Sequence, residues 1–226
     1  MPIPRRPALA IVNFWVLAAA LCLVPGTEAT HRQFPPAATA FLLAVGGAWS
    51  TWIVAGWRWG GAVLGLVAAS MAILYLAADR SLPTAHVLPG FLLAAGCAVA
   101  AIALTRASLS RRVRAEDRIF HGLTSYLLIG FAFGTALQRV AILYPGSFRF
   151  GGDSGATGVW ADFLWLSFST LTTAGFADIM PVGPWARFTC AAEAVTGVMY
   201  PAVFLARLVT SGPDGPDART PARGGP

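Results

Sequence analysis

The chain reads Ser167-Phe-Ser-Thr-Leu-Thr-Thr-Ala-Gly-Phe-Ala-Asp178, then Ile-Met-Pro181, between two long apolar segments. The aromatic and apolar residues up to Thr172 predict a short helix, and the paired threonines and small residues after it predict a turn and an extended segment. The apolar stretch Ala161–Thr172 is too short to cross a bilayer, which takes about 20 residues. We therefore expect a segment that enters a membrane and returns, with its backbone sheltered by protein or a water-filled cavity.

The composition of the whole chain indicates a membrane protein. Of the 226 residues, 56% are hydrophobic and only 12% are charged, and the mean hydropathy is +0.65. A soluble domain carries roughly 25% charged residues, and disordered chains are poor in apolar residues. The net charge of +6 comes from 16 arginines and no lysine, but no basic face on a soluble body is visible, so we expect no nucleic-acid partner.

Six apolar stretches are long enough to span a bilayer, which needs roughly 17–25 residues. With the short segment between the last two, they predict an all-α integral membrane protein with six transmembrane helices and a re-entrant helix and loop between the fifth and sixth. The spans are expected at Ala8–Val24, Ala37–Ala55, Ala62–Ala78, Val87–Leu104, Ile119–Tyr144 and Trp185–Val209.

The distribution of arginine predicts the orientation. Eleven arginines fall on the side of the two termini and five on the other, so the positive-inside rule places both termini in the cytoplasm. The fourth span contains no charge, whereas a voltage sensor needs several arginines within that helix. Arginines follow it instead and are expected to anchor the chain to anionic membrane lipids, at Arg106, Arg111, Arg112 and Arg114.

The order of elements around Asp178 suits ion conduction. A short helix that enters half of the membrane points its negative C-terminal end at the midplane, where a cation is favoured. An extended segment after it can line a narrow pore with carbonyl oxygens that replace the water around an ion. Polar packing between helices is the alternative for the threonines and serines alone.

The segment Thr172–Asp178 resembles the selectivity signature of potassium channels, usually Thr-Val-Gly-Tyr-Gly-Asp. Phe163–Thr172 is similar to the pore helix of these channels, Pro181–Arg187 to the turn that follows, and Ala191–Val209 to the inner helix. The resemblance is to bacterial members of the two-transmembrane-pore ion-channel family and covers Ile119–Val209. It divides the chain into a four-helix transmembrane region at 1–118, a pore domain at 119–210 and a disordered cytoplasmic tail at 211–226.

The resemblance implies roles for individual residues. Thr172 would face the cavity below the filter, and Asp178 would lie at the outer mouth, bonded to the indole N–H of Trp165. One loop per chain implies a homotetramer, because such a filter needs four. No cofactor, no metal beyond a permeant K⁺ or other monovalent cation, and no soluble partner are implied. The filter itself would comprise Thr172, Thr173, Ala174, Gly175, Phe176 and Ala177.

Three filter positions depart from the usual signature. Ala174 replaces valine, which is a mild change, and Phe176 replaces tyrosine and loses a hydroxyl that ties the filter to its surroundings. Ala177 replaces a glycine, the residue used where the backbone must take a positive φ. A left-handed conformation costs an alanine about 1–2 kcal/mol, so we expect this filter to relax and become less selective, or pinched and non-conducting.

The inner helix contains three further candidates. Gly197 and Pro201 predict either a gating hinge or static curvature, because proline removes a backbone hydrogen bond. Glu193 is a carboxylate within a span, where such residues are costly and often functional. It would contact the permeation path or a neighbouring subunit, or simply bond to Arg187 or a backbone group.

Two functional hypotheses follow for this chain. The first is a tetrameric cation channel of a bacterial inner membrane, which conducts monovalent cations passively and whose selectivity depends on Ala177. The second is a non-conducting membrane scaffold or regulatory subunit that retains the pore fold. No nucleophile–base pair, phosphate loop or metal-binding spacing stands out, so we do not expect an enzyme.

Overall fold

The structure, a computed structural model, describes residues 10–19, 57–77, 87–110, 115–151 and 160–210. Within these ranges the chain is mostly helical, as predicted. A short apolar helix, Ala10–Ala19, comes first. It is followed by α3 (Trp57–Ala77), α4 (Val87–Ser108), α5 (Ala115–Leu143), β1 (Phe148–Phe150), α6 (Trp160–Leu171), β2 (Ile179–Pro181) and α7 (Pro184–Thr210).

Among the described residues, three helices are long and apolar enough to cross a membrane: α4, α5 and α7. They coincide with the fourth, fifth and sixth expected spans. The third expected span falls largely on α3, which is 21 residues long, and Ala10–Ala19 lies within the first. The second expected span at 37–55 and the tail at 211–226 lie outside the described residues.

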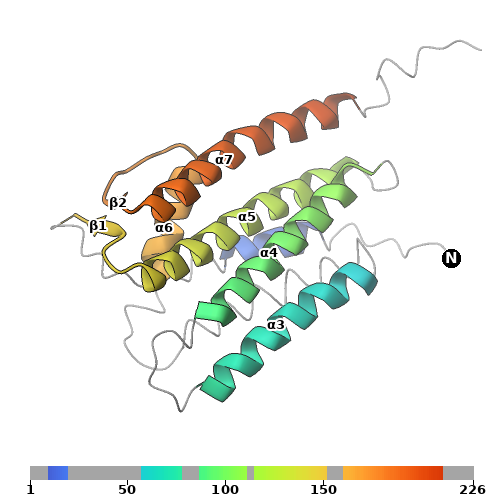
Figure 1. The fold of residues 1–226 in the computed structure, drawn as a ribbon. Coiled ribbons are helices and arrows are strands. Elements are labelled where there is room, and N and C mark those ends of the chain that lie inside the picture. Colours follow the sequence, from blue (N-terminus) through green and yellow to red (C-terminus); the bar gives the residue numbers. More distant parts are fainter. Residues whose placement is uncertain (1–9, 20–56, 78–86, 111–114, 152–159, 211–226) are drawn as a thin grey trace, which may run out of the picture.

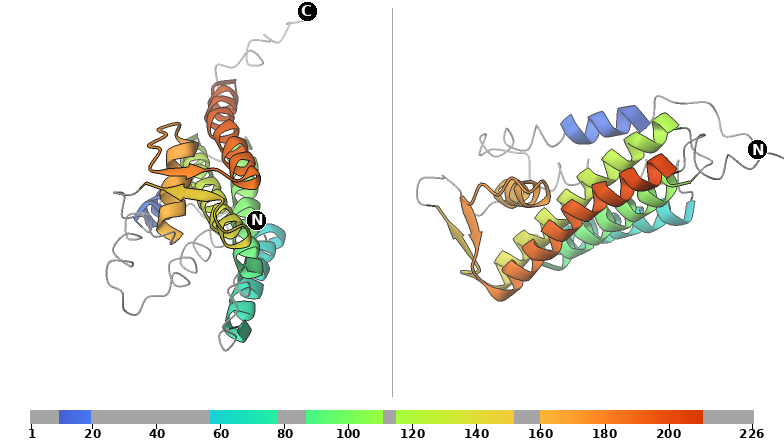
Figure 2. Two further views of the ribbon diagram at one scale, coloured as in Figure 1. Left: turned by 60° about the vertical axis from the view of Figure 1, so that its left-hand side comes forward. Right: turned by 90° about the horizontal axis from the view of Figure 1, so that it is seen from above.

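The long helices α3, α4, α5 and α7 run side by side, with α4 between α3 and α5, and α7 on the far side of α5 (Figure 1). The short helix α6 and both strands lie together at one end of this bundle, which we call the α6 end (Figure 2). The C-terminal end of α4 and the start of α5 lie at the opposite end, which we call the α4–α5 turn end (Figure 1). Small buried residues such as Gly96, Ala100 and Ala101 let α4 pack closely between its neighbours.

Two clusters of buried apolar side chains hold α6 in place. The first joins α6 to α4 and α5, and the second joins it to β1, β2 and the start of α7. Residues of the first cluster include Leu93, Leu104, Leu128, Phe131 and Leu164, and residues of the second include Leu137, Phe148, Phe163, Ile179 and Ala186.

The two short strands were not part of the all-α prediction. They pair antiparallel, with Phe148 opposite Pro181 and Phe150 opposite Ile179. Phe148 and Ile179 are buried, whereas the paired Arg149 and Met180 are exposed, so the side chains alternate between two faces. The ladder therefore places the segment that precedes α6 beside the segment that follows the loop after α6.

Candidate functional site

The helix α6 is positioned by close packing against α5 and α7. Its side chains Phe163, Leu164 and Leu171 are almost completely buried. Gly134 of α5 makes this possible, because a Cβ atom there would lie only 2.7 Å from the side chain of Leu164. Twelve residues make a helix about 18 Å long, which is shorter than the roughly 30 Å hydrocarbon core of a bilayer.

The turn after α6 is fixed by one backbone carbonyl. The C=O group of Ser169 accepts hydrogen bonds from the N–H groups of Ala174, at 2.8 Å, and Gly175, at 3.1 Å. The N–H of Thr173 donates to the carbonyl of Thr170, at 3.0 Å. The last turn of α6 therefore holds the start of the segment that follows it.

Every second residue of this segment has a left-handed backbone. The angle φ is 61° at Thr173, 60° at Gly175 and 59° at Ala177, while Ala174 and Phe176 lie outside the positive region. Such alternation turns successive peptide groups toward the same side of the chain. The N–H groups of Ala174 and Gly175 point back at α6, and the N–H and C=O of a trans peptide unit point in opposite directions. The carbonyls of Thr173 and Ala174 are therefore directed away from α6.

The expectation that the backbone relaxes at Ala177 is wrong for this structure. Ala177 keeps φ at 59°, in the region that costs a non-glycine residue about 1–2 kcal/mol. Its neighbours explain why: the carbonyl of Asp178 accepts a hydrogen bond from the Gly151 N–H, at 2.8 Å, and β2 begins at Ile179. A strained residue persists when its surroundings fix the chain on either side.

An aromatic residue and an acid close the far end of the segment. Trp165 Nε1 donates to a carboxylate oxygen of Asp178 at 2.8 Å, which is the hydrogen bond that the resemblance to potassium channels implies. The other carboxylate oxygen accepts from the Ile179 N–H at 3.1 Å. Phe176, which lacks the usual hydroxyl, stacks on Trp165 instead, with ring centroids 4.8 Å apart and planes 17° apart. The indole thus contacts both residues.

The segment Thr172–Ala177 lies on the surface of the chain, and all six of its residues are exposed. The Thr172 hydroxyl donates to the Phe168 carbonyl at 2.6 Å, so its side chain folds back on the last turn of α6. One side of the backbone of this segment is therefore accessible to solvent, ions or another molecule.

Behind the segment, the fully buried Glu193 of α7 contacts α6. One of its carboxyl oxygens is hydrogen-bonded to the hydroxyl of Ser167, which also lies 2.8 Å from the carbonyl of Gly130 in α5. The other oxygen is buried without a partner among the described residues. Pairing with Arg187, one of the alternatives for this carboxylate, is not found, because the Arg187 side chain donates to the Pro181 carbonyl at 3.3 Å. A serine on α6, rather than an arginine, is the partner that sequence reasoning missed.

Gly197 lies one turn further along α7 and has a packing role. A Cβ atom at this position would lie 2.0 Å from the carbonyl oxygen of Leu171, the last residue of α6. The same carbonyl accepts a hydrogen bond from the Tyr126 hydroxyl at 3.0 Å. Helix α7 continues unbroken through Gly197 and Pro201. The structure therefore places Gly197, and not Pro201, directly against the end of α6.

Residues 124–211 match the family described as "Ion channel". The match spans most of α5, all of α6 and α7, and the segment between them. The match and the apolar helices indicate that this part of the chain is a channel-like pore domain of a membrane protein, a class of transport proteins. Comparisons with curated proteins and with solved structures give no match. Among the described residues, no group of His, Cys, Asp and Glu side chains could hold a metal ion.

Proposed function

We propose that this chain is one subunit of a homotetrameric cation channel that conducts monovalent cations passively through a potassium-channel-like pore. The observation that carries the proposal is the alternation of positive φ at Thr173, Gly175 and Ala177 in an exposed segment. It turns backbone carbonyls to one side, and oxygen atoms in such rows can replace the water around an ion.

The elements around the segment support this role. The C-terminal end of α6, which carries negative partial charge, adjoins the start of the segment and favours a cation there. Asp178 lies at the other end and adds a negative charge at the outer mouth. Thr172–Ala177 form the filter in this proposal, and no cofactor takes part.

A homotetramer follows from the single segment in each chain. One segment offers carbonyls on one side only, and four copies around an axis enclose an ion. The exposed apolar side chains of α7, among them Val195, Val198 and Met199, are available for contacts with neighbouring copies or lipid. In the proposed topology, α6 is re-entrant between the fifth and sixth of six spans, and both termini face the cytoplasm of a bacterium.

One observation favours a second candidate, a non-conducting scaffold or regulatory subunit. The strain at Ala177 is repeated in each subunit and totals roughly 4–8 kcal/mol in a tetramer. If assembly of the tetramer disturbs the alternation of positive and negative φ, the pore would close while each subunit keeps its fold.

A flux experiment separates the two candidates. The full-length protein is reconstituted into potassium-loaded liposomes, and its release of K⁺ is compared with that of Ala177→Gly and Ala177→Val. We expect flux from the wild type and from Ala177→Gly, and loss of flux with Ala177→Val, because a β-branched residue is a steric outlier at positive φ. Flux only from Ala177→Gly would establish the scaffold, and flux from none of the three would contradict the channel.

A further inference from the structure

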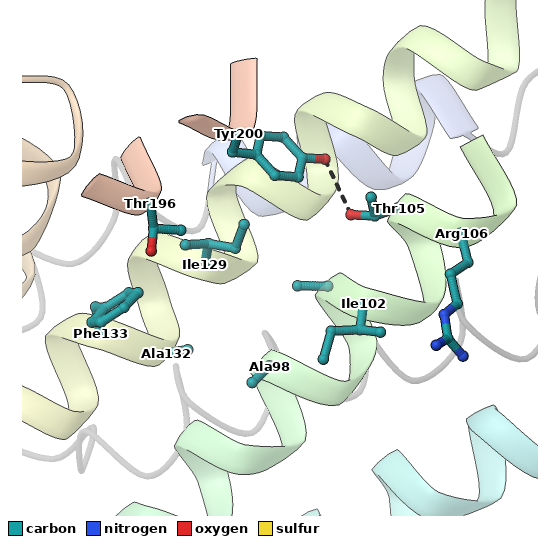
Figure 3. A pocket seen from close by; sticks show the side chains of 10 residues that line it. Ala98, Ile102, Thr105, Arg106, Ile129, Ala132, Phe133, Thr196 and Tyr200 are labelled. Atoms are coloured by element: carbon teal, nitrogen blue, oxygen red, sulfur yellow. Dashed lines mark hydrogen bonds between the residues drawn. The ribbon is translucent and has the colours of Figure 1, made fainter. Parts of the chain in front are cut away.

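A groove outside the filter segment lies between α4, α5 and α7 (Figure 3). Its volume is about 450 Å³. The walls are apolar and come from one face of each of two helices, with residues spaced three and four apart. These residues are Ala98, Ala101 and Ile102 on α4 and Ile129, Ala132 and Phe133 on α5.

The dimensions of the groove suit a single hydrocarbon chain. The lining residues of α4 run from Ala98 to Arg106, which is about 12 Å along a helix. A volume of about 450 Å³ over that length gives a cross-section of roughly 40 Å². A helix with its side chains is about 10–12 Å across and does not fit, so the groove excludes the helix of a neighbouring copy.

One end of the groove is polar. The hydroxyls of Thr105 and Tyr200 lie 3.2 Å apart, and the Tyr200 hydroxyl donates to the Gly122 carbonyl at 3.0 Å. Arg106 follows Thr105 on the same rim and is exposed. Its guanidinium carbon lies over the ring of Trp59, 5.4 Å from the centroid, and the group carries five N–H donors.

The charge that lines this end is positive. Among the described residues that line the groove, Arg106 is the only charged one. Arginine forms bidentate hydrogen bonds with phosphate groups, and basic residues next to a membrane span attract anionic lipids. The groove therefore combines an apolar channel with a cationic end.

We propose that this groove binds one acyl chain of an anionic phospholipid, with the lipid phosphate at Arg106. The chain lies along Ala98–Ile102 between α4 and α5, and the head group lies at the α4–α5 turn end, which faces the cytoplasm in the proposed topology. The proposal rests on the three membrane-spanning helices and not on ion conduction.

The test measures lipid that stays bound after purification. The full-length protein in detergent is mixed with vesicles of equal phosphatidylglycerol and phosphatidylcholine, repurified, and its bound lipids are quantified by mass spectrometry. We expect phosphatidylglycerol to be enriched, and Arg106→Gln to lower the enrichment about fivefold, the change for one arginine at an anionic surface. Arg58→Gln, the matched loss of an exposed arginine on α3, leaves the enrichment unchanged.

A second variant tests the apolar part of the groove. Ile102 is half exposed, so Ile102→Trp fills the groove without disturbing the core, and we expect it to reduce the binding of both lipids. Equal retention of the two lipids by the wild type, or unchanged retention by both Arg106→Gln and Ile102→Trp, would overturn the proposal. Cross-linking of a second copy through Ala98→Cys would overturn it as well. A protein that retains phosphatidylglycerol but conducts no K⁺ contradicts the channel and leaves the lipid site standing.

Discussion

The two faces of α7 differ in how they are held. On one face, Glu193 and Gly197 are buried against α6, and the loop beside them is fixed by hydrogen bonds within one chain. Further along the same face, Tyr200 and Phe204 contact Gly122 of α5. On the other face, Val198, Val203 and Val209 are all at least half exposed.

This difference distinguishes the contacts that form within one chain from those that require lipid or other copies of the chain. The segment Thr172–Ala177 has its geometry within one chain, because α6, β1 and β2 hold both of its ends. The exposed face of α7 is apolar and needs lipid or other copies to cover it. We therefore expect substitutions at the contacts between α6 and the buried face of α7 to change the stability of the single chain, and substitutions at exposed α7 positions to change it little.

The largest effect is expected for Gly197→Val. The added side chain meets the Leu171 carbonyl and forces α7 away from α6, which should lower the free energy of unfolding by about 3 kcal/mol. Thermal or denaturant unfolding in detergent measures this change. Val198→Ala at the exposed neighbouring position serves as the control and should stay within about 0.5 kcal/mol. Equal losses in the two variants would erase the difference between the two faces of α7.

Ser167→Ala should have the next largest effect. It leaves the buried carboxyl of Glu193 without its hydrogen bond, at a cost of about 1–3 kcal/mol in unfolding free energy. Adding Glu193→Met to Ser167→Ala removes the unpaired group and should restore most of the loss. If the double variant is no more stable than the single one, this contact does not join α6 to α7.

Trp165→Phe tests the closure of the loop. An aromatic ring that can stack on Phe176 is retained, but the hydrogen bond to Asp178 is lost, and we expect about 1 kcal/mol of destabilisation because the site is exposed. Trp185→Phe removes an indole of similar exposure at the start of α7 and is the matched control. An equal change in the midpoint of unfolding for Trp165→Phe and Trp185→Phe would show that the hydrogen bond between Trp165 and Asp178 does not stabilise the loop.

Ala177→Gly should give the smallest change, and a stabilising one. Relief of the left-handed conformation gains about 1–2 kcal/mol, and the extra freedom of glycine in the unfolded chain takes back about 0.4–1 kcal/mol. Ala174→Gly, at a position without positive φ, should destabilise instead. The sign of each change in unfolding free energy, rather than its size, decides the outcome.

Much of the pore domain could be predicted from local pattern. The spans that became α5 and α7 follow from long apolar runs, and α6 follows from a run too short to cross a membrane. The hydrogen bond between Trp165 and Asp178 was expected from a motif resemblance, because both residues belong to the matched stretch. The roles of individual residues in the proposed filter rest on the same resemblance.

Other features depend on where helices cross in space, and they could not be predicted from the sequence. Ser167 and Glu193 are 26 residues apart, and nothing in either neighbourhood indicates that α6 and α7 meet at these positions. The three-residue strands are too short to give a periodic signal. The conformation of Ala177 was predicted wrongly, because local preference opposes it, whereas hydrogen bonds and strand pairing around Asp178 hold the chain on the far side of Ala177.

The pairing of β1 with β2 has a consequence for how the sequence can vary. The ladder is made of main-chain groups, so the exposed residues Arg149 and Met180 can change with little effect on the clasp they belong to. Loss of a single residue within β1 is a different matter. It would shift the register by one and bring Arg149 to the buried face now occupied by Phe148 and Ile179. The exposed positions of this ladder can therefore vary in sequence, whereas the number of residues in β1 cannot change.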